Sequence, residues 1–432
     1  MIKDSRKAIV SWALYDWANS AFATTVMAAF FSIFFSSYWS LDQDSSVTTF
    51  WLGVANSVES LIVAILAPML GAIADSGSYR KKFLVFFAFL GALLTGCLGM
   101  IHAGAWVAAM FVYIIANIGF AGANIFYDAL LPTVASEKKV DFVSALGYSL
   151  GYIGGGLLFL VNVLMYLMPT VFGLPDDGGI SAVKASFVMV AIWWIVFSLP
   201  IFLFVKDDKK DDGLTIGKAV RKGIDDVKTT LHNLRSLKMT ALFLVAFWCY
   251  IDGVDTIIRM AVDYGASLGF PSESMIVALL ITQFVAFPSA LVYNIFGKKV
   301  GHKRAILIAI GAYGLISIIG CFMTNVWQFY ILACMIGLFQ GGIQALSRSY
   351  FTRFVPKGRE AQFFGFYNML GKFASIIGPF LVGAVTLVTG SHRVGILSLV
   401  LLFLVGGILL YKVDEEAGIR ATQEFSLMEK NA

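Results

Sequence analysis

Long apolar stretches dominate this sequence and limit the kind of protein it can form. A helix that crosses a bilayer needs about 20 mainly apolar residues. Hydrophobic residues make up 59% of the chain and charged residues only 14%, far below the roughly 25% charged residues of soluble domains. We therefore expect an all-α membrane protein that crosses the bilayer many times. Twelve stretches qualify as transmembrane helices: 9–38, 48–73, 83–102, 105–131, 141–168, 185–205, 239–266, 274–296, 304–324, 326–350, 361–389 and 393–412.

Lysine and arginine gather in alternate connections between these spans. Of the 32 such residues, 28 lie in the first seven positions, around 80–82 and 138–139, and in 206–238, 298–304, 348–359 and the tail after 411. Basic residues are enriched on the cytoplasmic side of membrane proteins. The pattern predicts an N-in, C-in topology and explains the net charge of +5 without a nucleic-acid partner.

The longest connection divides the chain into two halves of six spans each. We expect an N-terminal half at 1–205, a cytoplasmic linker at 206–238, a C-terminal half at 239–412 and a cytoplasmic tail at 413–432. Apolar residues recur at helical spacing in the linker, which predicts an amphipathic helix. It either lies on the inner leaflet or under the bundle, or docks a partner.

The two halves also share internal spacing. Asp128 precedes Gly151 by 23 residues, and Arg348 precedes Gly371 by 23 residues. Two sets of six spans joined by a long inside connection are typical of major facilitator transporters. In that architecture the substrate site lies near the midplane, between halves that rock to alternate access.

Several motifs resemble one family of that superfamily, the unknown-major-facilitator (UMF) family, which includes the fungal vacuole effluxers. The matching segments are WALYDWANSAF at 12–22, SALGY at 144–148, GLFQGGIQALSRS at 337–349, PKGRE at 356–360 and FFGFY at 363–367. The resemblance implies a secondary transporter of the major facilitator fold. Fungal relatives are associated with the release of amino acids from the vacuole, so an amino acid is the best candidate substrate.

The connection after the second span resembles the superfamily's GxxxD loop motif, with Gly71 and Asp75 in place. By this resemblance Asp75 contacts the start of span 11 and latches the halves, and a carboxylate is stabilised at a helix N-terminus. The alternative is a solvated loop carboxylate. The second copy, at 294–304, has Lys298 where the acid would stand, which predicts a single latch.

Ionisable residues inside spans cost roughly 2.5–3.5 kcal/mol each and are candidates for function. Glu59 and Lys372 lie near the middle of spans 2 and 11. We expect them to pair in one access state and separate in another. The alternatives are a permanent structural bridge, snorkelling of Lys372, or binding of an anionic substrate group by Lys372.

Span 7 carries Asp252, Asp255, Arg259 and Asp263 on one helix face. Asp255 and Arg259 can pair within the helix. Asp252 has no cation three or four positions away, so we expect it, with Glu59, to take part in proton coupling. The alternative is a carboxylate that faces a water-filled cavity.

Polar residues in spans 1 and 10 complete the predicted substrate path, which consists of Asp16, Asn19, Asp252, Gln340, Gln344 and Lys372. Asp16 fits either a hydrogen-bonded cytoplasmic gate or a contact with a substrate amine. Trp12 fits the aromatic belt at the membrane interface. The glycines at every fourth position in span 5, Gly147, Gly151 and Gly155, predict close helix packing.

These features favour a monomeric secondary active transporter for a small polar solute, driven by alternating access and coupled to protons. The partners we expect are the solute, protons and membrane lipids. The residues indicate no cofactor, no metal site and no enzymatic nucleophile–base set, and the expected location is a bacterial inner membrane. The alternatives are a lipid or lysolipid flippase on the same fold, a sensor or scaffold that does not transport, and a passive channel.

Overall fold

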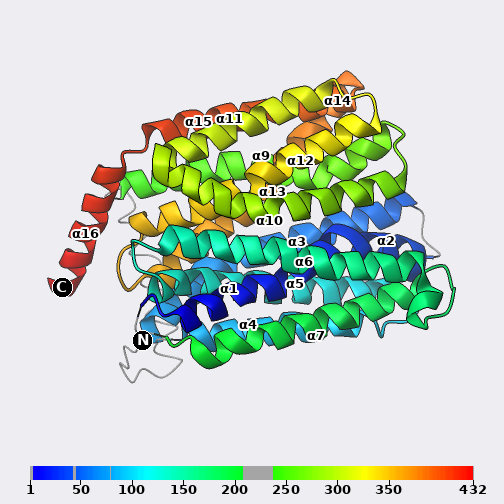
Figure 1. Cartoon of the computed structure of the whole chain (residues 1–432), viewed down its shortest axis with the longest axis horizontal. Helices are drawn as coiled ribbons and strands as arrows, with labels where there is room; N and C mark the ends of the chain where they lie inside the picture. The colour runs from blue at the N-terminus through cyan, green and yellow to red at the C-terminus, as the bar shows by residue number, and fades with distance from the viewer. Residues whose placement is uncertain (1–2, 42–44, 78, 208–236, 432) are drawn as a thin grey trace.

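The computed structural model describes residues 3–41, 45–77, 79–207 and 237–431. Every regular element within these ranges is a helix. The long helices run side by side along one axis (Figure 1). The amphipathic helix predicted in the linker falls on 208–236, outside the described residues.

The N-terminal half begins with one unbroken helical span, Arg6–Trp39, that changes type along its length. It comprises α1 (Arg6–Ala21), the π-helix η1 (Phe22–Phe30), α2 (Phe31–Phe34) and a second π-helix, η2 (Phe35–Trp39). The half continues with α3 (Ser45–Gly77), α4 (Arg80–Leu98), α5 (Trp106–Val134), α6 (Val140–Leu167), the short η3 (Pro169–Phe172) and α7 (Ile180–Phe204).

The C-terminal half repeats this plan and adds a helix after its last span. Its elements are α9 (Lys238–Ser267), α10 (Ser272–Val300), α11 (His302–Cys321), α12 (Val326–Phe351), η4 (Thr352–Phe354), α13 (Glu360–Thr389), α14 (His392–Leu397), α15 (Val400–Lys412) and α16 (Glu415–Asn431).

Local sequence explains where several of these helices begin and end. The Asn325 side chain accepts a hydrogen bond from the Gln328 N–H (3.0 Å), and the Gln328 side chain accepts one from the Asn325 N–H (3.3 Å), a capping box at the start of α12. Gly301 separates α10 from α11 with a φ of +93°, and Gly390 ends α13 with a φ of +68°. Glycine adopts these positive φ angles without the steric penalty that a Cβ imposes.

Eleven helices among the described residues are long and apolar enough to cross a membrane. They correspond to the predicted spans except 361–389, which falls in α13. α13 is 30 residues long, but within the described residues its apolar part is the shorter Ile377–Thr389. The count of twelve spans therefore stays a prediction.

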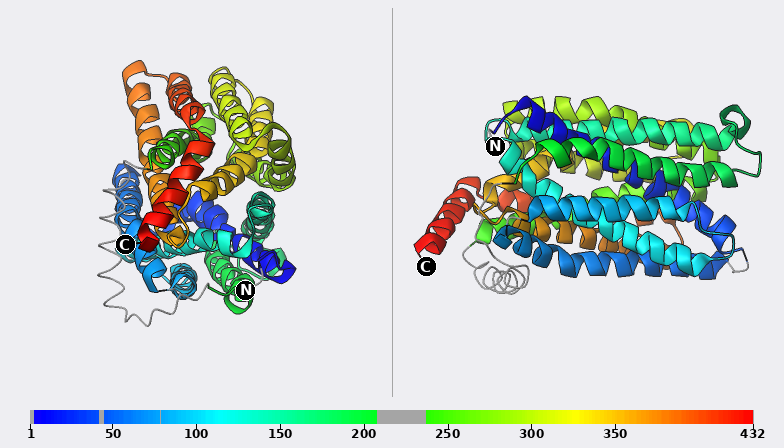
Figure 2. Two further views of the ribbon diagram at one scale, coloured as in Figure 1. Left: turned by 90° about the vertical axis from the view of Figure 1, so that its left-hand side faces the viewer. Right: turned by 90° about the horizontal axis from the view of Figure 1, so that it is seen from below.

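Both chain termini lie at the same end of the bundle, which we call the terminal end; the opposite end is the far end (Figure 1). The first turns of α4, α6, α11 and α13 meet at the terminal end, where α16 extends outward (Figure 2). The N-terminal half occupies the lower part of Figure 1 and the C-terminal half the upper part.

The two halves meet along a seam in which α3 and α5 pack on α13, and α6 packs on α10 and α12. Two glycines bring α3 and α13 into backbone contact near the terminal end. A Cβ on Gly71 would lie 2.1 Å from the Ala361 carbonyl oxygen, and a Cβ on Gly365 would lie 2.5 Å from that of Ala67. This close approach places polar groups of the two halves within hydrogen-bond reach.

Candidate functional site

An arginine of the C-terminal half lies buried among groups of the N-terminal half. The sequence places Arg348 in the basic segment 348–359, but the residue belongs to α12 and is only 1% exposed. Its Nε donates to the Ser144 hydroxyl (3.0 Å) and its Nη2 donates to the Ser144 carbonyl (2.9 Å). Arg348 lies in the predicted span 326–350, but its grouping with the basic residues of the connection is wrong, because partners from α6 satisfy the charged group inside the protein.

Two carboxylates of the N-terminal half neutralise this guanidinium. Arg348 Nη1 lies 3.1 Å from Asp128 Oδ1 and 3.5 Å from Asp16 Oδ2. The other Asp128 oxygen accepts a hydrogen bond from the Asn368 amide of α13 (3.1 Å). Asp16 Oδ2 also accepts one from the Tyr127 hydroxyl (2.9 Å). The network joins α1 and α5 to α12 and α13, and so spans the seam.

Aromatic rings close around the same guanidinium. Its central carbon lies 4.1 Å from the ring centroid of Tyr148, 4.9 Å from that of Trp12 and 5.4 Å from that of Tyr127, distances typical of cation–π contacts. The Trp12 indole N–H donates to the Tyr127 carbonyl, and the two rings stack with centroids 4.2 Å apart. Trp12 is fully buried. The prediction that Trp12 lies in the interfacial belt is wrong, because its indole packs against Tyr127 and the Arg348 guanidinium inside the protein.

The predicted contact of Asp75 with the start of span 11 is present in the structure. Asp75 Oδ1 accepts a hydrogen bond from the Ala361 N–H (3.1 Å), and Oδ2 accepts one from the Gln362 N–H (2.8 Å), both in the first turn of α13. Arg80 Nε lies 2.7 Å from Asp75, and Arg80 Nη2 lies 2.5 Å from Glu360 across the seam. Charge and helix dipole together favour this contact.

A second contact across the seam, in which Arg353 forms an ion pair with Asp141, contradicts the prediction of a single latch. His302, at the start of α11, places Nε2 2.8 Å from Asp141 Oδ2 in the first turn of α6. Arg353 Nη2 lies 3.0 Å from His302 Nδ1 and 3.5 Å from Asp141. Arg353 also pairs with Glu415 of α16 (2.5 Å). Here the acid lies in the first turn of α6 and its partners lie at the start of α11 and in η4, whereas the acid of the first latch lies at the end of α3.

Polar side chains of the predicted path lie further from the terminal end. The Tyr152 hydroxyl donates to Gln344 Oε1 (2.5 Å), which is another bond between the halves. Gln340 is buried, and its Oε1 has no hydrogen-bond partner among the described residues. Asn19 donates to the Asn124 side chain (2.6 Å), within the N-terminal half.

The glycines of span 5 lie against the first span, as close packing requires. A Cβ on Gly147 would lie 2.9 Å from Asp16 Oδ2, and a Cβ on Gly151 would lie 2.6 Å from the Ser20 hydroxyl oxygen. A Cβ on Gly155 would lie 3.0 Å from the Ser20 carbonyl oxygen. These contacts seat α1 against α6 beside the buried charges.

Asp252 lies apart from this network, within the C-terminal half. It is 1% exposed, and its carboxylate accepts hydrogen bonds from the Gly378 N–H of α13 (2.9 and 3.0 Å) and from the Thr256 hydroxyl (3.3 Å). On the same helix Asp255 is half-buried and Arg259 is exposed. Their pairing within the helix stays a prediction.

The side chain of the predicted partner of Glu59 falls outside the described structure. Glu59 is 4% exposed in α3, where its carboxylate accepts a hydrogen bond from the Ser60 hydroxyl (3.3 Å) and makes further contacts. The side chains of Lys372 and Asp263 are not part of the described structure. The Glu59–Lys372 pair therefore stays a prediction.

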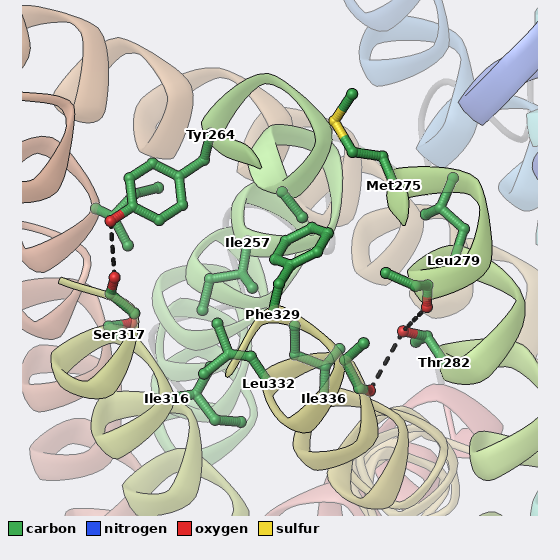
Figure 3. A pocket seen from close by; sticks show the side chains of 15 residues that line it. Ile257, Tyr264, Met275, Leu279, Thr282, Ile316, Ser317, Phe329, Leu332 and Ile336 are labelled. Carbon is green, nitrogen blue, oxygen red and sulfur yellow. Dashed lines mark hydrogen bonds between the residues drawn. The ribbon is translucent and has the colours of Figure 1, made fainter. Parts of the chain in front are cut away.

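A cavity of about 50 Å³ lies inside the C-terminal half, between α9, α10, α11, α12 and α14 (Figure 3). Its walls are almost entirely apolar, and Ile257, Phe329 and Leu332 are among them. The Tyr264 hydroxyl donates to the Gly320 carbonyl and that of Thr282 to Ala278. Because these hydroxyls are already paired with backbone carbonyls, the cavity offers little to a polar solute.

Several residues of the site escaped the sequence reasoning. Four residues make contacts across the seam, yet none was a candidate site residue: Arg348, Asp128, Asp141 and His302. The shared spacing that aligns Asp128 with Arg348 was the available signal. Among the described residues, no group of three or more His, Cys, Asp and Glu side chains is arranged to hold a metal ion.

Comparison with solved structures defines the class of protein. The human organic anion transporter MFSD10 (TETRAN) superposes with a TM-score of 0.71 at 14% identity, over 95% of this chain and 100% of that chain. The proton:xylose symporter XylE gives a TM-score of 0.71 at 15% identity, over 97% of each chain. At these identities the likeness shows the fold, which is that of the major facilitator superfamily.

Sequence relatives then identify the family. Residues 44–423 match the family described as vacuole effluxer Atg22 like, and the chain belongs to it. An uncharacterized MFS-type transporter, YxiO of Bacillus subtilis (strain 168), is 38% identical over 98% of this chain and 99% of its own length. Autophagy-related protein 22 of Yarrowia lipolytica is 25% identical over 86% of this chain and 76% of its own.

The resemblance read from the sequence motifs is therefore confirmed. The chain is a multi-pass integral membrane protein of a transporter family, and its relatives are transporters rather than enzymes.

Proposed function

We propose that this protein is a secondary active transporter that moves a small polar solute by alternating access. The observation that carries the proposal is the buried Arg348 network, because its carboxylates belong to one half and its guanidinium to the other. Breaking a buried ion pair is strongly unfavourable. Such a contact suits a gate with two discrete states, and the latches of Asp75 and Asp141 reinforce its closed state.

The substrate we propose is an amino acid. A zwitterion needs partners of both signs, and the proposed path of Asp16, Asn19, Asp252, Gln340, Gln344 and Lys372 offers carboxylates, amides and a cation. The family description, vacuole effluxer, fits the movement of solutes across a membrane.

Proton coupling is assigned to Asp252, with Glu59 as a second candidate. Asp252 is almost fully buried, and the hydrogen bonds described above come from neutral donors. Burial penalises the charged form of a carboxylate. Protonation would then alter the contact between α9 and α13. Both helices belong to the C-terminal half, which moves against α3 and α5 of the N-terminal half.

We further propose twelve spans with both termini in the cytoplasm, because the terminal end carries most of the basic residues. The Bacillus subtilis relative favours a bacterial cell membrane. The transporting unit is taken to be a monomer, with the gate contained in one chain.

The test is uptake of a labelled panel of amino acids and small metabolites into proteoliposomes, with and without an inward proton gradient. Wild type is compared with Asp252→Asn and Lys372→Ala, and Asp176→Asn, an exposed carboxylate at the far end, is the matched control. Gradient-driven accumulation that Asp252→Asn abolishes, with exchange retained, supports a symporter with its proton on Asp252.

Other outcomes redirect the assignment. Accumulation that ignores both the gradient and Asp252→Asn refutes proton coupling and leaves a uniporter or an exchanger. If no member of the panel moves, the proposal of a polar-solute transporter fails, and lipid translocation or a role without transport takes its place.

A further inference from the structure

The groups that surround the Arg348 guanidinium form a cage that belongs to the N-terminal half alone. Its acidic members are Asp16 on α1 and Asp128 on α5, and its aromatic walls are Trp12, Tyr127 and Tyr148. We call this set the cation cage. The α12 arginine enters it from the other half, as a ligand would.

The cage is held together by contacts that do not depend on the arginine. Trp12 stacks on Tyr127 and donates to its carbonyl, and the Tyr127 hydroxyl donates to Asp16. Gly147 leaves the space in which these side chains meet, since a Cβ there would lie within 2.9 Å of both the Asp16 and Tyr127 oxygens. These bonds lie within the N-terminal half, so they can persist when the halves separate.

Separation at the terminal end would leave the cage with two carboxylates and no cation. Asp128 would lose both Arg348 and the Asn368 amide, because α12 and α13 move with the C-terminal half. Asp16 would keep the Tyr127 hydroxyl but lose the guanidinium. The two carboxylates would then face the opened pathway without a fixed counter-charge, so a mobile cation can take the place of the guanidinium.

We infer that the vacated cation cage binds the positively charged group of the transported solute, a primary ammonium or a guanidinium. Arg348 then acts as a tethered competitor that fills the cage whenever the terminal end is closed. The inference rests on the proposed function in one respect, that the halves separate at this end. It narrows the substrate class to solutes that carry an organic cation.

The aromatic walls favour an organic cation over a bare proton. Protonation of Asp16 and Asp128 would remove the charge but would make no use of three ring faces. Those faces attract ammonium and guanidinium groups, and the Ser144 hydroxyl and carbonyl are placed to accept their N–H groups. The proton alternative is separated by experiment.

The test removes the arginine from the cage and measures which cations bind in its place. Arg348→Gln keeps a side chain that can bond to Ser144 but removes the charge. The purified full-length variant is titrated with millimolar guanidinium or ethylammonium chloride while thermal unfolding is followed. Urea, the neutral isostere of guanidinium, and sodium chloride at equal ionic strength are the controls.

We expect a saturable rise in Tm of roughly 2 °C or more with either organic cation and no rise with urea. Wild type, whose cage is filled, should respond less. The double variant Arg348→Gln/Asp128→Asn should lose most of the response, because one of the two carboxylates is gone.

Three results would overturn the inference. The first is no saturable rise with any organic cation, and the second is an equal rise in the double variant. The third is stabilisation of Arg348→Gln by acid alone with no effect of the amines, which would assign the carboxylates to protons.

A second measurement covers the case in which Arg348→Gln does not fold. Amino acids and their N-acetylated analogues are then compared as ligands that raise the Tm of the wild type, and equal shifts would overturn the inference. Because both tests measure binding, they are independent of transport. Uptake without binding in the cage would refute the inference that the cage binds the solute. Binding in the cage without uptake would refute the proposed transport function.

Discussion

The Asp75 carboxylate allows the strength of the closed terminal end to be measured. It accepts hydrogen bonds from the Ala361 N–H (3.1 Å), the Gln362 N–H (2.8 Å) and Arg80 Nε (2.7 Å). Asp75→Asn keeps one acceptor oxygen but replaces the other with an amide nitrogen, which faces a donor. A hydrogen bond to a charged group contributes about 1.5–3 kcal/mol and a neutral one about 0.5–1.5 kcal/mol. We therefore expect the closed state to lose about 2 kcal/mol.

A loss of this size changes the ratio of closed to open molecules about 30-fold. A population that is about 99:1 closed would become about 3:1, so that roughly a quarter of the molecules are open. The measurement is electron–electron double resonance between spin labels at Lys138 and Lys357, which are exposed at the terminal end on opposite halves. The labels require replacement of the four native cysteines.

We expect Asp75→Asn to add a longer-distance population to the label distribution. Asp176→Asn, an exposed carboxylate at the far end, should leave the distribution unchanged. A distribution for Asp75→Asn that matches the wild type would refute the reasoning, provided that substrate or low pH opens the wild type measurably.

Two further substitutions test neighbouring contacts. Gly147→Ala should lower Tm, because the added Cβ would lie 2.8 Å from the Tyr127 hydroxyl and overpacking costs about 1–3 kcal/mol. The control is Gly314→Ala, whose Cβ would have nothing within 4 Å, and equal Tm values for the two variants would contradict the argument. His302→Ala removes the imidazole of the second contact between the halves. It should lower the stability of the closed state by about 1 kcal/mol, which changes the ratio of closed to open molecules about five-fold, so the label distance should widen less than in Asp75→Asn. An unchanged distance would show that this contact does not hold the halves together.

The hydrophobic pattern and a few motifs were enough to predict the class of protein. Span positions follow from runs of apolar residues, which need no knowledge of tertiary contacts. The contact of Asp75 with the start of span 11 could be predicted because the GxxxD motif is local and resembles that of the superfamily, in which the acid contacts this helix N-terminus. Short-range patterns of this kind survive in a single sequence.

The charged network could not be read in the same way. Arg348 is separated from Ser144 by 204 residues and from Asp128 by 220. Hydropathy alone assigns a single arginine near a span end to the aqueous side, since it does not reveal a distant carboxylate. The burial of Arg348 depends on partners that only the packed halves bring together.

The second latch was missed for a different reason. A repeat of the loop motif would place an acid at a fixed position, and Lys298 stands there. The structure instead places Asp141, in the first turn of α6, against His302 at the start of α11 and Arg353 in η4. Corresponding parts of the two halves are in contact in both latches, but the acidic residue lies on a different element in each. A motif with a fixed acid position does not reveal this arrangement.

The positions of Asp128 and Arg348 also bear on how such a chain could arise from a duplicated half. Each lies twelve residues before the first residue of the next long helix, α6 or α13. Two identical halves would bring acid against acid or base against base at this point, and like charges repel. A half of this protein therefore cannot close this gate with a copy of itself. The opposite charges therefore make the two halves complementary rather than interchangeable at this contact.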